Sequence, residues 1–271
     1  MAFHKHPLRG YLRHYLWSYV ICNKLLHRRR GEPLTVSIKG KPFLFPNTAS
    51  GVGELRSIFI DEVFARLKGP GRILDLGGFL GETAVYFLVN GATDVHAYEP
   101  LPSAFSYLKR NLRPYKAKAF PFAVGPAAGT QTLRVDATSS FDLGASLREA
   151  DETKQHTTRI RTVSIASVLQ RTKFDALKMN IEGAEFAILD HLMAHPGLWR
   201  FSRGHIGFHF YGKHAQHWRT YRRFRTFLSE RGYRVLMLRL DDSIVPETAV
   251  TNAYRDLPAQ TYLLFNIYFE R

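Results

Sequence analysis

Asp75-Leu76-Gly77-Gly78-Phe79-Leu80-Gly81 joins an apolar segment, residues 72–76, to a segment with helical periodicity, residues 82–90. A strand that runs into closely spaced glycines and then into a helix is typical of nucleotide-binding folds, because glycine lets the backbone turn sharply and approach a ligand. The spacing differs from the Gly-x-Gly-x-x-Gly loop that places a diphosphate on a helix N-terminus. The acid at position 75 disfavours a diphosphate and favours a cationic ligand.

A second acid follows the next predicted strand, residues 94–98, in the pair Glu99-Pro100. A carboxylate at the tip of that strand is placed to accept hydrogen bonds from both hydroxyls of a ribose. The alternative is that each acid caps the helix that follows it. Two acids one strand–helix–strand step apart, with a glycine loop between them, favour a cationic nucleoside such as S-adenosylmethionine (SAM), which carries an ammonium and a sulfonium group.

Outward from this stretch, apolar strand patterns alternate with helical patterns. Alternation of this kind predicts an α/β fold with a mostly parallel, Rossmann-like sheet of seven strands covered by helices on both faces. The last two predicted strands, 233–240 and 261–269, have no predicted helix between them and are expected to form an antiparallel hairpin at one edge. The other predicted strands are 72–76, 94–98, 117–124, 175–180 and 205–210, and the predicted helices are 54–67, 82–90, 103–112, 184–193 and 216–231.

Two regions are predicted: a basic N-terminal extension, 1–50, and a ligand-binding domain, 51–271. The extension is expected to contain an amphipathic helix over 1–30 and a β-hairpin over 31–46, whose turn contains Gly40. The helix either lies on an anionic membrane surface or packs on the domain or on a second subunit. Peripheral membrane contact and a homo-oligomer therefore both stay open.

Composition limits the class of protein. The chain has 271 residues, 38 Lys and Arg against 23 Asp and Glu, and a formal net charge of +15. This charge either attracts an anionic partner, such as an acidic sugar, a membrane surface or nucleic acid, or forms a solvated basic surface. The single cysteine, Cys22, excludes an internal disulfide framework. Because no apolar run is long enough to span a bilayer, a cytoplasmic protein is expected.

These residues, with a later motif, resemble the FkbM family of SAM-dependent methyltransferases. The resemblance covers roughly residues 54–210 and depends on four segments, of which the last is the most specific. They are Ile73–Gly81, Ala97-Tyr98-Glu99-Pro100, Phe122-Ala123-Val124-Gly125 and Leu177-Lys178-Met179-Asn180-Ile181-Glu182-Gly183-Ala184-Glu185. The resemblance implies a class I methyltransferase fold that binds SAM, releases S-adenosyl-L-homocysteine (SAH) and methylates hydroxyls of sugars, glycans or secondary metabolites. The predicted cofactor-binding residues are Asp75, Gly77, Gly78, Phe79, Gly81, Glu99, Pro100, Ala123 and Asn180.

The predicted catalytic residues follow the fourth and fifth strands: Asn180, Glu182 and His209. Methyl transfer to a hydroxyl requires a group that removes the acceptor proton, and His209 is the candidate base because imidazole titrates near neutral pH. Glu182 is a second candidate base, and His205 is a weaker one. Asn180 stands where the family has aspartate, and an amide orients a hydroxyl but does not accept its proton. A divalent metal stays open, but no repeated ligand spacing indicates one.

The sequence alone is compatible with three functions. The first is methylation of a small-molecule or glycan hydroxyl, with an anionic acceptor left open. The second is RNA methylation, which the charge favours, but Asn180-Ile181-Glu182-Gly183 lacks the Pro-Pro-aromatic sequence common in enzymes that methylate base amino groups. Nucleic acid is therefore disfavoured as a partner. The third is a non-catalytic SAM-binding protein, which Asn180 favours.

Overall fold

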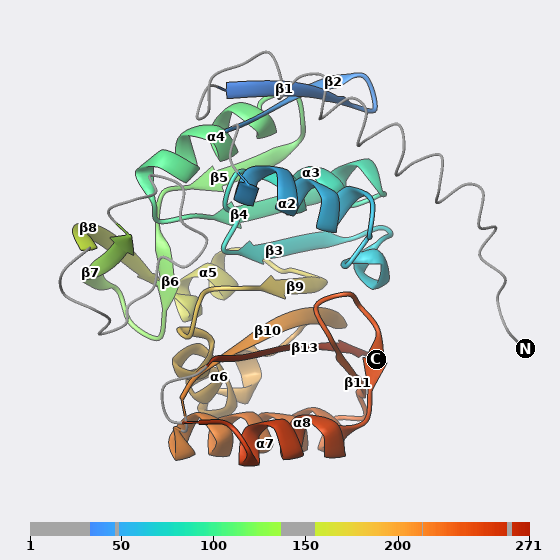
Figure 1. Cartoon of the computed structure of the whole chain (residues 1–271), viewed down its shortest axis with the longest axis vertical. Coiled ribbons are helices and arrows are strands. Elements are labelled where there is room, and N and C mark those ends of the chain that lie inside the picture. The colour runs from blue at the N-terminus through green and yellow to red at the C-terminus, as the bar shows by residue number, and fades with distance from the viewer. Residues whose placement is uncertain (1–32, 47–48, 137–154, 213, 259–261) are drawn as a thin grey trace, which may run out of the picture.

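The computed structural model describes residues 33–46, 49–136, 155–212, 214–258 and 262–271 (Figure 1). The predicted N-terminal helix, residues 1–30, and residues 137–154 lie outside the described residues. Within the described part, no helix is both long and apolar enough to cross a membrane.

The fold is built on an eight-stranded sheet with the order β12-β11-β13-β10-β9-β3-β4-β5. The five strands from β10 to β5 are parallel, and β13 is antiparallel to both of its neighbours, β10 and β11. The predicted α/β class with a mostly parallel sheet is therefore confirmed. The strands are β3 Arg72–Leu76, β4 Asp94–Tyr98, β5 Ala117–Phe120, β9 Ala176–Met179, β10 Arg203–Tyr211, β11 Arg234–Leu238, β12 Ile244–Val245 and β13 Tyr262–Glu270.

Helices cover both faces of the sheet, as the apolar alternation along β3 shows. Ile73 packs into a core shared with α2, α3 and α4, whereas its neighbour Leu74 packs into a second core shared with α5, α6, α7 and α8. Figure 1 shows α2 and α3 beside β3 and β4, and α7 and α8 at the far end of the sheet. The helices are α2 Ala49–Phe59, α3 Glu82–Val89, α4 Pro102–Leu112, α5 Ile165–Arg171, α6 Glu185–Ala194, α7 Ala215–Glu230 and α8 Glu247–Arg255, with short 3-10 turns at Ala65–Leu67 and Pro196–Leu198.

The predicted hairpin is present as β1, Pro33–Ile38, and β2, Lys41–Pro46. Its two-residue turn has positive φ at Lys39 and Gly40, the geometry that suits a tight antiparallel hairpin. The Asn111 side chain, on α4, accepts a hydrogen bond from the Leu44 amide and donates to the carbonyls of Leu44 and Leu80. A single side chain thus joins the hairpin to the glycine loop.

Three predictions about the elements are wrong in detail. The strand predicted over 117–124 is interrupted at Pro121, which has no N–H to donate to a sheet hydrogen bond. Its second part, β6 Ala123–Gly125, pairs instead with β8, Gln155–Ser164, in a separate three-stranded sheet with β7, Gly129–Asp136. The helix predicted over 54–67 ends at Phe59, because Glu62 adopts a positive φ of 54°.

The closing strands also differ from the prediction, since β12 and α8 lie between them in the chain. β13 is inserted between β10 and β11 and is not an edge strand. Its nearly continuous apolar sequence, Leu263–Phe269, explains this position, because a strand covered on both faces needs apolar residues on both.

Candidate active site

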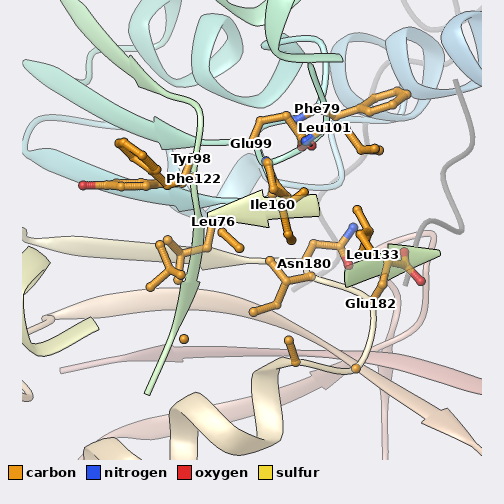
Figure 2. A pocket seen from close by; sticks show the side chains of 18 of the residues that line it. Leu76, Phe79, Tyr98, Glu99, Leu101, Phe122, Leu133, Ile160, Asn180 and Glu182 are labelled. Carbon is orange, nitrogen blue, oxygen red and sulfur yellow. Dashed lines mark hydrogen bonds between the residues drawn. The ribbon is translucent and has the colours of Figure 1, made fainter. Parts of the chain in front are cut away.

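A cavity of about 510 Å³ lies where β3, β4 and β9 end. Figure 2 shows Glu99 and Leu101 on one side of this first cavity and Asn180, Leu133 and Glu182 on another, with Ile160 between them. Glu99 and Leu101 follow β4, Asn180 and Glu182 follow β9, and Leu133 and Ile160 come from β7 and β8. Parallel strands bring these side chains together because their carboxyl ends meet at one edge of the sheet.

The glycine loop packs closely against neighbouring chain segments. Gly77 has φ of 82°, and a Cβ atom on it would lie 2.1 Å from the carbonyl oxygen of Asn180. A Cβ atom on Gly78 or Gly81 would approach side-chain atoms of Ala97 or Leu108 at 3.2 and 3.1 Å. Of the three predicted glycines, Gly77 lines the first cavity, whereas Gly78 and Gly81 are absent from the described residues around it. These two glycines therefore serve the packing of the loop on α4 and β4.

The carboxylate of Asp75 contacts other protein groups and holds neighbouring elements together. Its side chain is fully buried and lies outside the set of described residues that line the first cavity. One carboxylate oxygen accepts a hydrogen bond of 2.6 Å from the hydroxyl of Thr83, and the other lies 3.0 Å from Nζ of Lys178. Lys178 Nζ also donates to the Gly77 carbonyl. Asp75 thus holds the start of α3 and the end of β9 against β3, which shapes the cavity from behind.

Glu99 lines the first cavity, as predicted, together with Phe79, Pro100, Ala123 and Asn180. Its carboxylate oxygens accept hydrogen bonds from the amides of Phe79, at 3.0 Å, and Leu101, at 2.9 Å. Burial raises the pKa of Glu99 to about 7, although these two hydrogen bonds oppose the shift. Each oxygen keeps a second lone pair, so the ionised group is able to accept hydrogen bonds from the two hydroxyls of a ribose.

The apolar wall of the first cavity was only partly anticipated from the sequence. Leu133 and Ile160 are 5% and 4% exposed and lie across the cavity from the ends of the main strands. No local motif marks them, because they belong to a long connection whose pairing is decided by tertiary contacts. The described apolar residues that form the wall include Phe64, Leu76, Phe79, Tyr98, Leu101, Phe122, Ala123, Val124, Leu133, Ile160 and Ile181.

The predicted catalytic residues Glu182 and His209 lie together. His209 Nε2 is 3.4 Å from Glu182 Oε1, and His209 Nδ1 is 3.1 Å from Glu185 Oε1. Burial alone would lower the pKa of His209, but the carboxylates of Glu185 and Glu182 raise it to about 10. The imidazole is therefore a cation at neutral pH. Glu182 has a positive φ of 55°, a conformation that is uncommon outside glycine and that turns its side chain toward the cavity.

A second cavity, of about 490 Å³, adjoins the first. Both are lined by Glu54, Phe64, Asn180 and Glu182. His209 lines only the second cavity, and so does His205, which is 4% exposed and whose Nε2 has no hydrogen-bond partner among the described residues. Burial and the cations of Lys178 and Arg66 lower the pKa of His205 to about 3, so this imidazole is neutral.

Two glutamates at the site were missed by the sequence analysis. Glu54 comes from α2 and Glu82 begins α3, and both line the first cavity. Glu82 was detectable as the acid directly after the glycine loop, whereas nothing local marked Glu54. Among the described residues, no group of three or more His, Cys, Asp or Glu side chains is arranged to hold a metal ion. Carboxylates and apolar walls together suit a cationic nucleoside, and the buried, unpaired Oε2 of Glu82 fits such a ligand.

The comparison with known families agrees with this site. A family model described as the methyltransferase FkbM domain matches residues 75–235, more than half of the 271 residues. The matched range begins at the acid before the glycine loop and includes the motif around Glu182. No curated protein matches the chain.

Solved structures of methyltransferases are similar at low sequence identity. Methyltransferase FkbM from Methylobacillus flagellatus is 14% identical, with a TM-score of 0.43, over 80% of this chain and 53% of that one. The chain thus spans about half the length of that protein. A SAM-dependent methyltransferase from Agrobacterium tumefaciens is 12% identical, with a TM-score of 0.49, over 90% and 72% of the two chains. TYW2 from M. jannaschii, in complex with AdoMet, is 12% identical, with a TM-score of 0.42, over 90% and 89%.

Proposed function

Because the chain belongs to the FkbM family of SAM-dependent methyltransferases, we propose that it transfers the methyl group of SAM to a hydroxyl of a sugar, a glycan or a secondary metabolite. The observation that carries the proposal is the pair of adjoining cavities. The first is lined by six of the nine predicted cofactor-binding residues, Gly77, Phe79, Glu99, Pro100, Ala123 and Asn180. The second shares with it the wall formed by Glu54, Phe64, Asn180 and Glu182. Two ligands in these cavities would meet at that wall.

The first cavity suits SAM in both shape and chemistry. Its apolar wall provides a surface for the adenine ring, and Glu99 is placed to accept hydrogen bonds from the ribose hydroxyls. When bound, SAM supplies an electrophilic methyl group on a positively charged sulfur. The side chains at the shared wall hold the acceptor and remove its proton.

Glu182 is the better candidate for the proton acceptor. The sequence favoured His209, but that imidazole lies between two carboxylates and already carries its proton at neutral pH. Glu182 lines both cavities, and its side chain is 22% exposed. We assign to His209 the positioning of this carboxylate, and to Asn180 a hydrogen bond that orients the acceptor hydroxyl.

The lining of the second cavity favours an acceptor group without charge. Its polar side chains include the carboxylates of Glu54 and Glu182, the amides of Asn180 and Asn266, and the hydroxyl of Ser57. Carboxylates and amide oxygens accept hydrogen bonds from hydroxyls. The His209 imidazolium also lines this cavity, but Glu182 and Glu185 already balance its charge. The carboxylates of Glu54 and Glu182 would therefore repel a phosphate or a uronate. We therefore propose a neutral hydroxyl acceptor, although the whole chain has a net charge of +15.

A transfer assay tests this proposal. The full chain is incubated with SAM carrying an isotopically labelled methyl group and with separate pools of neutral glycosides, uronates, sugar phosphates and total RNA. Mass spectrometry then locates the labelled methyl. Labelling of a hydroxyl in the neutral pool supports the proposal, whereas labelling confined to RNA, with affinity that falls steeply as salt rises, supports RNA methylation instead.

Two variants extend the assay. Glu182→Gln is expected to bind SAH as the native protein does but to lower the transfer rate by about two orders of magnitude, the usual contribution of a general base. Asn266→Leu, which alters a residue lining the second cavity but not the first, is expected to weaken acceptor use without changing SAH affinity. Full transfer activity in Glu182→Gln would contradict its role as the base.

A further inference from the structure

The first cavity is lined by more acidic than basic side chains. The ionisable side chains that line it are Glu54, Glu82, Glu99, Glu182, Lys178, His214 and His217. Lys178 does not neutralise the four glutamates, because its Nζ lies 3.0 Å from Asp75 and donates to the Gly77 carbonyl. A ligand that completes this cavity therefore brings positive charge.

Glu82 is the carboxylate that lacks a counter-group. It is 3% exposed, and its Oε2 is buried with no hydrogen-bond partner among the described residues. By contrast, both oxygens of Glu99 accept backbone hydrogen bonds, and Glu182 lies beside His209. A buried carboxylate oxygen without a donor is costly, by an amount that exceeds an ordinary hydrogen bond.

Glu54 adds a second carboxylate at the same place. It lies on α2, lines both cavities and interacts with Glu82 strongly enough to raise the pKa of Glu82, after the larger effect of burial. Burial likewise raises the pKa of Glu54. Two carboxylates that repel each other form a receptor for a cation, which would bind to the ionised pair and relieve the repulsion.

We propose that Glu82 and Glu54 bind the primary ammonium group of the amino-acid part of SAM. The inference rests on the proposed function, since it requires SAM in the first cavity. It assigns different parts of one ligand to different acids: the ribose hydroxyls to Glu99, after β4, and the ammonium to Glu82, after β3.

Calorimetry with two ligands tests the assignment. SAH carries the ammonium group, whereas 5′-methylthioadenosine has the same adenine and ribose but no amino acid. In Glu82→Gln, SAH affinity is expected to fall about tenfold or more, because the loss of a charge-assisted hydrogen bond weakens binding by about that factor. The affinity for methylthioadenosine is expected to be unchanged. Glu54→Gln is expected to show the same selectivity with a smaller loss. The control is Glu230→Gln, at an exposed glutamate on α7, which should bind both ligands as the native chain does.

The outcomes distinguish a failure of the proposed SAM site from a failure of the ammonium site alone. Native protein that binds neither ligand would overturn the SAM site itself, and this inference with it. Suppose instead that the native protein binds both ligands. A Glu82→Gln variant that keeps full SAH affinity, or that loses affinity for both ligands equally, would then overturn the ammonium site alone. Binding of methylthioadenosine by the variant also shows that its first cavity is folded.

Discussion

Nζ of Lys178 lies 3.0 Å from Oδ1 of Asp75, and the two side chains are 3% and 0% exposed. This buried ion pair joins β9 to β3 at the edge of the sheet where the first cavity opens. Because Asp75 also accepts a hydrogen bond from Thr83, the pair fixes three elements around the glycine loop. In this structure the pair holds the edge of the site in shape.

Removing the lysine from this pair should destabilise the fold. Lys178→Met leaves Asp75 buried without a cation, which typically costs about 3 kcal/mol in the free energy of unfolding. Urea denaturation followed by circular dichroism measures the change. Lys173→Met, at an exposed lysine before β9, serves as the control and should alter the free energy by less than about 0.5 kcal/mol. Equal stabilities of the two variants would contradict the structural role of the pair.

His209 should make stability depend on pH in the alkaline range. Its pKa is raised from 6.5 to about 10 in the folded state, against the effect of burial, by Glu185 and Glu182. The folded state therefore holds the proton more strongly, and this contribution to stability is complete below pH 6.5 and is lost as the pH rises through about 10.

His209→Gln measures that contribution directly. The variant should be less stable than the native protein by about 3 kcal/mol at neutral pH, because Glu185 stays buried without its cation. The difference in the free energy of unfolding should be largest near pH 6 and should shrink toward pH 10. A difference that is the same at both ends of this range would show that the imidazole is not charged.

Glu99 should make nucleoside binding depend on pH near neutrality. Burial raises its pKa from 4.5 to about 7. In the free protein this shift favours folding at low pH, and that stability is lost as the pH rises from 4.5 through about 7. The ionised carboxylate accepts ribose hydroxyls better than the protonated acid does, so methylthioadenosine should bind more tightly at pH 8 than at pH 6.

The matched variant is Glu99→Gln, compared with the native protein in the same titration. It should bind methylthioadenosine about tenfold more weakly at pH 8, and the difference should decrease at pH 6. Glu82→Gln should leave this binding unchanged. Loss of affinity that is independent of pH would indicate that Glu99 acts only by holding the Phe79 and Leu101 amides.

A methyl group added at Gly77 should disrupt the site. In Gly77→Ala the new Cβ atom would lie 2.1 Å from the Asn180 carbonyl oxygen, and φ of 82° is unfavourable for alanine. The expected result is a loss of about 2 kcal/mol in the free energy of unfolding, with weaker SAH binding because the loop and the end of β9 move apart. Thermal melts and calorimetry report the two effects.

Gly53→Ala is the control for this substitution. Gly53 lies within α2, and a Cβ atom on it would meet nothing within 4 Å. Alanine favours a helix interior over glycine by roughly 1 kcal/mol, so this variant should be slightly more stable with unchanged SAH affinity. If Gly77→Ala were as stable as Gly53→Ala and bound SAH equally well, the loop would be able to shift away from Asn180.

Much of the fold was predictable because its signals are local. The apolar runs and helical periodicities identified the parallel strands from β3 to β10, and strand ends that meet at one sheet edge brought Glu99, Asn180 and Glu182 to one cavity. The place of β13 between β10 and β11 was not predictable, since it depends on pairing partners far away in the sequence. The pairing of β7 with β8, which brings Leu133 and Ile160 to the cavity wall, was not predictable for the same reason.

The sequence by itself determined the family, the cofactor class and several segments that line the first cavity, because a glycine loop, an acid after the next strand and a later motif are contiguous patterns. Only the tertiary structure decided the state and partners of each acid and imidazole. Burial and neighbouring charges make His205 neutral and His209 cationic, although the two lie four residues apart on one strand. The same long-range packing brings Glu54 and Glu82 to one cavity. Such effects depend on desolvation and on distances between elements, which no local pattern encodes.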